Sequence, residues 1–165
     1  MVSTYTTIET PIAPFTAIVD EDGVVLASGW TRGVEHLLPV IHPALRPVDV
    51  VEGDIGEVAD AIVRYHDGDL SAVDAVRVRQ RSGPFTEHAW DVLRTVPAGA
   101  PITYTEYATK AGRPAAVRAA ASACARNAAA LFVPCHRVLG ADGTLRGFRW
   151  GTEVKRALLV HESSA

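Results

Sequence analysis

Cysteine is scarce in this chain, and only Cys124 and Cys135 occur among its 165 residues. Two thiols do not make a disulfide framework, and neither CxxC nor HExxH spacing occurs, so we expect a reducing compartment and no metal site. No apolar run is long enough to span a bilayer. The first residues lack the basic region and apolar core of a signal peptide, so we expect a cytoplasmic protein with no membrane segment.

A strong net charge is also missing, because 16 Lys and Arg residues nearly balance 19 Asp and Glu residues. The balance differs along the chain: residues 1–82 carry a net charge of −7 and residues 83–165 a net charge of +4. Between Lys110 and Arg156 there are nine basic residues and two acidic ones. This distribution favours contact between the second half and a polyanion, although ordinary surface variation also explains so few charges.

The first half has the pattern of a mixed α/β fold. Strand formers occupy residues 5–10, 15–19 and 24–28, and the Asp20–Gly23 turn indicates a hairpin between the second and third runs. Residues 75–78 favour a last strand. Helical spacing predicts a helix over residues 54–66 from Ile55, Val58, Ala59, Ile62 and Val63.

Other features of this half point to no catalytic site. Its histidines, His36, His42 and His66, are scattered, and we interpret them as surface or loop residues and not as ligands. A boundary is expected near Ser82–Pro84, which divides the chain into domains 1–82 and 83–165.

The second half is predicted to be mostly helical. An aromatic and apolar helix face, interpreted as core, is formed by Phe85, Ala89, Trp90, Val92 and Leu93. The Thr103–Glu106 segment has the T-x-x-E form of a capping box and begins a short helix that ends near Gly112. Pro114 suits the first turn of a second helix, which runs to Arg126. Two helices joined by a short glycine-containing turn predict a helix-turn-helix.

The second of these helices is rich in alanine, and Arg118 is its single long cationic side chain before Arg126. Cys124 lies on the same helix, and we interpret it as a packed thiol. The segment Pro134–Val138 places a thiol, an imidazole and a guanidinium on consecutive residues. A thiolate is a strong nucleophile, and nearby cationic or imidazole groups favour it. By itself this pair is also compatible with a buried structural thiol beside a surface histidine.

Several further motifs occur in a fixed order around Cys135. They are Pro97-Ala98-Gly99, Ile102-Thr103-Tyr104, Arg118, Asn127, Val133-Pro134-Cys135-His136-Arg137-Val138, Gly147-Phe148-Arg149-Trp150-Gly151, and Lys155 to Leu159 followed by Glu162. The arrangement resembles the O6-alkylguanine-DNA alkyltransferases, also called methylated-DNA–protein-cysteine methyltransferases. The resemblance is close over residues 83–165 and loose before them. It implies an RNase H-like α/β domain followed by a mostly α, winged-helix-like domain with a helix-turn-helix.

The resemblance also implies a function. Cys135 would accept the alkyl group of O6-alkylguanine, and of O4-alkylthymine, in duplex DNA once per molecule and without cofactor or metal. The resemblance implies that Glu162 orients His136, that His136 removes the thiol proton through a water, and that Tyr104 donates a proton to the leaving guanine. Asn127 would hold the active-site turn. A monomer is expected to bind the minor groove through Arg118, Ala116, Ala119 and Arg126. The substrate pocket would be lined by Val133, Pro134, Phe148, Arg149 and Trp150.

Some positions depart from the family pattern. Phe148 stands where many members have tyrosine, and Arg149 and Trp150 replace small residues, which bears on the alkyl groups that fit. Two other functions stay open. One is an alkyltransferase-like protein that binds lesions without transferring the alkyl group. The other is a cysteine hydrolase that uses Cys135, His136 and a carboxylate.

Overall fold

The computed structural model describes residues 2–163, and the chain forms two compact units. The first unit contains the residues up to Arg81 together with 128–132. The second contains residues 82–127 and the chain from Val133 onward. The sequence predicted a single boundary near residue 82 and did not predict that residues 128–132 belong to the first unit. That residues 1–82 and 83–165 are separate domains stays a prediction.

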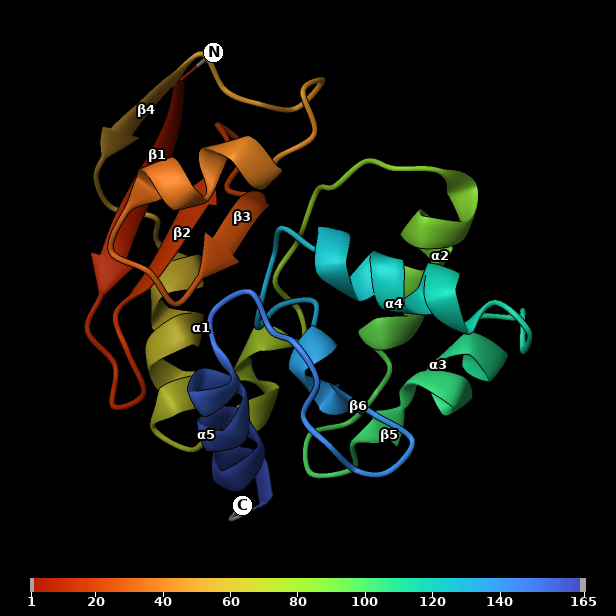
Figure 1. Cartoon of the computed structure of the whole chain (residues 1–165). Helices are drawn as coiled ribbons and strands as arrows, with labels where there is room; N and C mark the ends of the chain where they lie inside the picture. The colour runs from red at the N-terminus through yellow and green to blue at the C-terminus, as the bar shows by residue number, and fades with distance from the viewer. Residues whose placement is uncertain (1, 164–165) are drawn as a thin grey trace. The chain divides into compact units, whose positions relative to one another are not determined.

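The first unit is built on a mixed sheet of four strands (Figure 1). In chain order the strands are β1 (Val2–Ile8), β2 (Phe15–Val19), β3 (Val25–Gly29) and β4 (Asp49–Glu52). Their order in the sheet is β3-β2-β1-β4. The β1–β2 and β2–β3 pairs are antiparallel, whereas β4 runs parallel to β1.

The turn between β2 and β3 is stabilised by the side chain of Asp20. Its Oδ1 accepts hydrogen bonds from the backbone N–H groups of Asp22 (2.9 Å) and Val24 (3.1 Å). Gly23 adopts φ +77°, a conformation that side chains other than hydrogen rarely adopt. The predicted hairpin is therefore confirmed, with β2 at the expected residues 15–19.

The other strand predictions need correction. β1 begins and ends earlier than the expected run 5–10. The strand expected at 75–78 is absent from the described residues, where Val78 forms only an isolated bridge to Val25. The sequence did not indicate β4, because this edge strand is mostly exposed and begins and ends with acidic residues, so it lacks a buried apolar alternation.

Two distant segments cover the outer edge of β3. Arg77 and Arg79 exchange backbone hydrogen bonds of 2.9 Å with Val25. Ser28 donates its N–H to the carbonyl of Ala128 (2.8 Å) and its hydroxyl to that of Ala130 (2.7 Å). An edge strand otherwise leaves its backbone groups unpaired. These bonds explain why residues 128–132 belong to the first unit.

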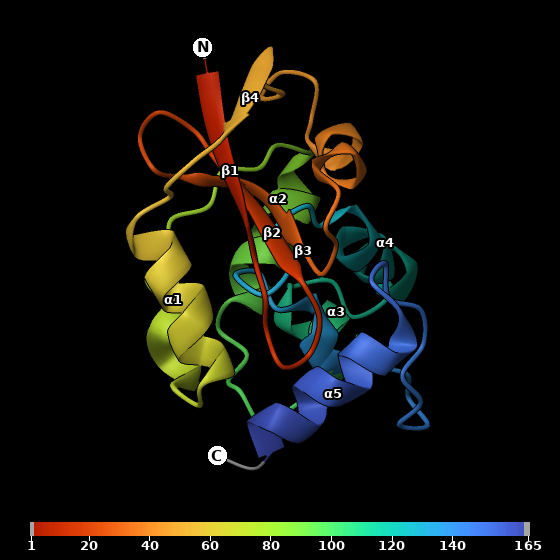
Figure 2. The same ribbon diagram turned by 90° about the vertical axis from the view of Figure 1, so that its left-hand side faces the viewer.

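Helix α1 (Glu57–His66) lies alongside the strands of this unit (Figure 2). It begins three residues later than predicted because Gly56 has φ +64°, which is not helical. Its buried side chains are those of Val58, Ala61, Ile62, Tyr65 and His66. Val63, which was part of the helical spacing, lies on the helix but is 44 % exposed. The assignment of His66 to the surface or a loop is also wrong, because His66 is buried on the helix with Nδ1 2.7 Å from the Ile62 carbonyl oxygen.

The second unit is mostly helical. Its helices are α2 (Pro84–Leu93), α3 (Tyr104–Lys110), α4 (Val117–Arg126) and α5 (Thr152–Ser163). Strands β5 (Ile102–Thr103) and β6 (Val138–Leu139) form a short parallel pair that the sequence did not predict. No helix within residues 2–163 has the length and apolar character needed to cross a membrane.

Helix α2 packs against α3 and α4 through its buried face. Trp90 donates its indole N–H to the Ala123 carbonyl (2.8 Å), and Tyr107 donates its hydroxyl to the Ala89 carbonyl (2.7 Å). The core prediction therefore holds for Trp90. Phe85 is only half-buried and lies under the guanidinium of Arg113, 5.1 Å from its ring centre.

The two helices of the predicted helix-turn-helix are present, with one boundary shifted. Thr103 and Glu106 form the predicted capping box, with reciprocal bonds of 3.1 and 3.0 Å. Helix α4 begins at Val117 and not near Pro114. Ala116 has non-helical dihedral angles, and its N–H donates to the Arg113 carbonyl in a preceding turn.

Candidate active site

The conspicuous Cys-His-Arg segment forms a single 3-10 turn, Cys135–Arg137, between an apolar run and β6. The turn is closed by backbone bonds from Cys135 N–H to the Val133 carbonyl (2.8 Å) and from Arg137 N–H to the Pro134 carbonyl (3.0 Å). Cys135 is 8 % exposed, and the next two side chains are buried. Because the pairing of β6 with β5 holds the end of the turn, the three reactive groups have fixed positions.

Asn127 connects the end of α4 to the thiol. It follows the last residue of the helix, and its Nδ2 lies 2.7 Å from the Val133 carbonyl oxygen and 3.3 Å from Cys135 Sγ. Burial raises the pKa of the Cys135 thiol, while the Asn127 hydrogen bond and the charges of Lys155 and Arg149 oppose that rise. The resting group is therefore a thiol surrounded by groups that stabilise a thiolate.

Glu162 on α5 is shared by two side chains of the turn. Its Oε2 lies 2.8 Å from His136 Nε2 and accepts from Arg137 Nη2 at 2.9 Å, and its Oε1 accepts from Arg137 Nε at 2.9 Å. Burial alone would raise the pKa of Glu162, but the hydrogen bonds from His136 and Arg137 and the positive charge of Arg137 hold it well below its ordinary value. The carboxylate is thus ionised and accepts all three bonds.

This ionisation decides the tautomer of His136. Burial lowers the pKa of the imidazole and the Glu162 bond only opposes that shift, so the ring is neutral near pH 7. Nε2 must then carry the proton that it donates to Glu162, which leaves Nδ1 as an acceptor. Nδ1 is buried and has no hydrogen-bond partner among residues 2–163. A basic nitrogen is therefore available one residue from the thiol.

Sequence reasoning assigned no role to Arg137 or Lys155. Arg137 also donates Nη1 to the Val96 carbonyl (2.7 Å), and the buried Lys155 donates Nζ to the Val138 carbonyl (2.8 Å). The sequence did contain a sign that Lys155 is buried. Leu158 and Glu162 follow Lys155 by three and seven residues, so all three lie on the same face of the helix, and Leu158 is buried. Charged residues on a core-facing stripe indicate buried polar contacts.

Tyr104 and Arg118 lie together on a cavity of about 390 Å³ in the second unit. Burial, together with the nearby Cys124 and Cys135, raises the pKa of Tyr104 to about 12, so its hydroxyl is neutral. The cavity is lined by Tyr104, Thr105, Val117, Arg118, Ala121, Gly140, Ala141 and Arg146. The proposed pocket residues do not line it; they are Val133, Pro134, Phe148, Arg149 and Trp150.

Arg149 instead attaches the loop of residues 140–151 to the end of α4. Its guanidinium donates to the carbonyl oxygens of Ala125 and Asn127, the latter at 3.0 Å. Of the other residues expected on DNA, Ala119 and Arg126 are exposed on α4, and Ala116 immediately precedes the helix. The structure therefore places the predicted DNA contacts on α4 or directly before it, and brings Asn127 and Glu162 to the Cys135–His136 turn from the end of α4 and from α5.

Gly99 allows close approach of the chain to α5. It has φ +80°, and a Cβ at this position would lie 3.2 Å from the backbone oxygen of Glu162. A side chain here would be strained by its backbone and would crowd the helix that carries the carboxylate. The Pro97-Ala98-Gly99 motif thus positions the Glu162 backbone.

No group of three or more His, Cys, Asp and Glu side chains within residues 2–163 could hold a metal ion. Cys124 is half-buried, and burial raises its pKa well above the ordinary value.

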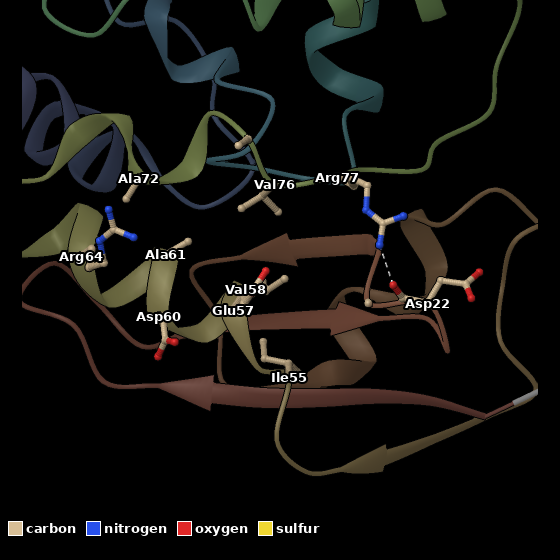
Figure 3. Close-up of a pocket in the computed structure, with 12 residues that line it drawn as sticks. Asp22, Ile55, Glu57, Val58, Asp60, Ala61, Arg64, Ala72, Val76 and Arg77 are labelled. Atoms are coloured by element: carbon tan, nitrogen blue, oxygen red, sulfur yellow. Dashed lines mark hydrogen bonds between the residues drawn. The ribbon is translucent and has the colours of Figure 1, made fainter.

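The first unit has its own cavity of about 450 Å³ beside α1 (Figure 3). Its lining has no thiol, imidazole or hydroxyl, and Arg77 donates to the Asp22 carbonyl there (2.7 Å). The cavity of the first unit therefore lacks a thiol, hydroxyl or imidazole nucleophile.

Comparison with known proteins shows which family the chain resembles. The family described as "6-O-methylguanine DNA methyltransferase, DNA binding domain" matches residues 84–164. The methylated-DNA–protein-cysteine methyltransferase of Shigella flexneri is 34 % identical over 94 % of this chain and 92 % of its own length. That of Mycobacterium bovis is 35 % identical over 97 % of this chain and 92 % of its own.

A solved structure extends the similarity to the fold. The O6-methylguanine methyltransferase of Mycobacterium tuberculosis is 32 % identical and superimposes with a TM-score of 0.80, covering 98 % of this chain and 93 % of that one. The same protein in complex with DNA gives a TM-score of 0.78 at 30 % identity over the same shares of the two chains. By sequence along nearly its whole length and by fold, the chain belongs to the methylated-DNA–protein-cysteine methyltransferase family.

Proposed function

We propose that this protein repairs DNA by moving the alkyl group of O6-alkylguanine, and of O4-alkylthymine, onto Cys135. The Sγ–carbon bond forms as the bond between that carbon and O6 breaks. The electron pair of the broken bond stays on guanine, which takes up a proton in place of the one that Cys135 loses. The thioether is stable, so each molecule reacts once, and no cofactor or metal takes part.

One observation carries this proposal: Cys135 is held by Asn127 beside a histidine that is itself fixed by an ionised glutamate. A nucleophile, a base and a group that orients the base are the parts of an activated thiol. His136 Nδ1 accepts the thiol proton through a water molecule. Lys155 and Arg149 then favour the thiolate by their positive charge.

The lesion reaches the thiol only after extrusion, because a base inside the duplex cannot present its O6 substituent to the enzyme. A monomer binds the minor groove through α4, with Ala116, Ala119 and Arg126 close to the backbone. Arg118 fills the gap in the stack. Tyr104, neutral at physiological pH, donates a proton to the leaving guanine. We infer that the first unit is RNase H-like and the second winged-helix-like.

The extruded base would be held by residues around the Cys135 turn. Val133 and Pro134 are buried next to the thiol, and Phe148 and Trp150 are half-buried on the loop that Arg149 attaches to α4. The aromatic side chains would limit the size of the alkyl group.

Intact mass spectrometry tests the proposal directly. The protein is mixed with excess duplex containing one O6-methylguanine, and we expect a gain of one methyl group per molecule, mapped to the peptide with Cys135. Cys135→Ser should bind the duplex and gain nothing, because a hydroxyl has no accessible anion at neutral pH. Cys124→Ser is the matched control and should gain the methyl group as the wild type does.

Two outcomes would support the other functions instead. Tight and selective binding of the lesion without any gain in mass would indicate a lesion-binding protein. Repeated hydrolysis of an ester substrate that depends on Cys135 would indicate a hydrolase.

A further inference from the structure

Arg146 occupies an unusual place on the cavity shared by Tyr104 and Arg118. Three segments line this cavity: the start of α3, one side of α4, and the loop that contains Gly140, Ala141 and Arg146. Apart from Arg146 and Arg118, its lining residues carry no charged side chain. Two guanidinium groups on a mostly apolar cavity in a basic half of the chain match an anionic ligand.

The backbone of Arg146 is held in a conformation that arginine rarely adopts. Its φ is +54°, and among residues 2–163 only Leu131 and Arg146 are non-glycine residues with positive φ. Such strain persists where the surroundings hold the residue in place. Gly140 is part of those surroundings, because a Cβ there would lie 2.5 Å from Arg146 Nε. The missing side chain of Gly140 therefore gives Arg146 the space to cross the loop.

The charge of Arg146 is only weakly compensated. Its Nη2 lies 3.9 Å from Asp142 Oδ1, and both side chains are more than half exposed. The same oxygen already accepts bonds from the N–H and hydroxyl groups of Thr144, at 3.1 and 2.7 Å. Arg146 is thus held near Asp142 without a close ion pair, so its guanidinium can bind another anion.

We propose that Arg146 binds a DNA backbone phosphate that flanks the extruded nucleotide, a site built from the loop and separate from the contacts of α4. This inference rests on the proposed function. Extrusion brings the flanking phosphates to the protein surface at the point where Tyr104 and Arg118 lie. Arg118 is committed to the gap in the base stack, and Tyr104 is neutral. Arg146 is therefore the cation of this cavity that remains for a phosphate, which guanidinium groups bind well.

Salt dependence of binding gives the first test. Affinity for a duplex containing one O6-methylguanine is measured from 50 to 200 mM salt in a Cys135→Ser background, which prevents reaction, with Arg146 intact and with Arg146→Lys, Arg146→Asn or Arg156→Asn. Asparagine tolerates positive φ, so the second variant removes the charge without adding backbone strain. One lost phosphate contact should reduce the steepness of log K against log salt by about 0.9. The ratio of the Arg146 to the Arg146→Asn binding constant should therefore fall about 3.5-fold between 50 and 200 mM salt.

Lysine keeps the charge, so Arg146→Lys should keep most of the slope. Arg156 is an exposed arginine of α5 that does not line the cavity, so Arg156→Asn should keep the wild-type slope. An unchanged slope in Arg146→Asn, or an equal change in Arg156→Asn, would overturn the inference. Thermal unfolding of each variant verifies that it is folded.

A phosphate scan locates the partner. Duplexes with O6-methylguanine receive one uncharged methylphosphonate at each position around the lesion, and binding is measured in a Cys135→Ser background to prevent reaction. We expect one position next to the lesion at which neutralisation weakens binding with Arg146 but has no further effect with Arg146→Asn. Additive effects at every position would contradict the inference.

The same preparations separate this inference from the proposed function. If the wild type gains no methyl group from the duplex, the proposed function fails. If it does gain one while the slope and the scan show no phosphate for Arg146, only the inference fails.

Discussion

Replacing Glu162 by glutamine tests how one carboxylate serves both the fold and the chemistry. Glu162 is 3 % exposed and accepts bonds from His136 Nε2 and from two nitrogens of Arg137. An amide has only one oxygen, so its NH₂ group must face either Arg137 Nε–H or the pair His136 Nε2–H and Arg137 Nη2–H. Every orientation therefore places a donor against a donor and leaves the buried guanidinium without its counter-charge.

The expected cost follows from that arrangement. Removing one partner of a buried ion pair destabilises a protein by roughly 3–5 kcal/mol. With a urea dependence of about 2 kcal/mol per M, the unfolding midpoint of Glu162→Gln should fall by roughly 1.5–2.5 M. Loss of the group that orients the base should slow methyl transfer on the order of 10²–10⁴-fold. Urea unfolding followed by circular dichroism and single-turnover transfer to Cys135 measure the two effects.

A second variant separates the two effects. Arg137→Met in combination with Glu162→Gln removes the guanidinium that the single change leaves uncompensated. The double variant should be less destabilised than the sum of the single variants, by about 2 kcal/mol, because the two residues share one network. Its transfer should stay as slow as that of Glu162→Gln. Additive stabilities, or a transfer rate that recovers together with stability, would refute the reasoning.

Three further predictions follow from the same contacts. Asn127→Ala removes the hydrogen bond that lowers the pKa of Cys135, so the pH–rate profile of transfer should move to higher pH, and an unmoved profile would contradict this role. The folded-state pKa values of His136 and Glu162 lie below their ordinary values of 6.5 and 4.5. As pH falls, the unfolded chain therefore takes up protons before the folded protein does, and the free energy of unfolding should decrease below about pH 6.5. Urea midpoints measured from pH 7.5 to 4 verify the sign, and midpoints that do not change with pH would contradict it. Arg118→Ala should slow repair of duplex DNA strongly and reaction with free O6-benzylguanine little, if the pocket admits that base; equal losses would instead assign Arg118 to the fold or the pocket.

The features that the sequence predicted correctly depend on neighbours along the chain. The Thr103–Glu106 capping box and the Asp20–Gly23 turn are closed by side chains two to four residues from their partners. The order of motifs around Cys135 identified the family before any contact was known. The errors at helix and strand ends arose from backbone angles, as at Gly56 and Ala116, that composition does not reveal.

Beyond the Glu162–His136 contact that the resemblance implied, the tertiary structure decided what the buried charges contact. Glu162 meets His136 and Arg137 across about 25 residues, and Lys155 meets the Val138 carbonyl across 17. Residues 128–132 look like a continuous apolar run in sequence, yet they close the edge of a strand a hundred residues earlier. Local patterns determine turns and helix ends because their partners are nearby. A buried ion pair is specified only when packing removes both groups from water, which depends on segments that the chain brings together as it folds.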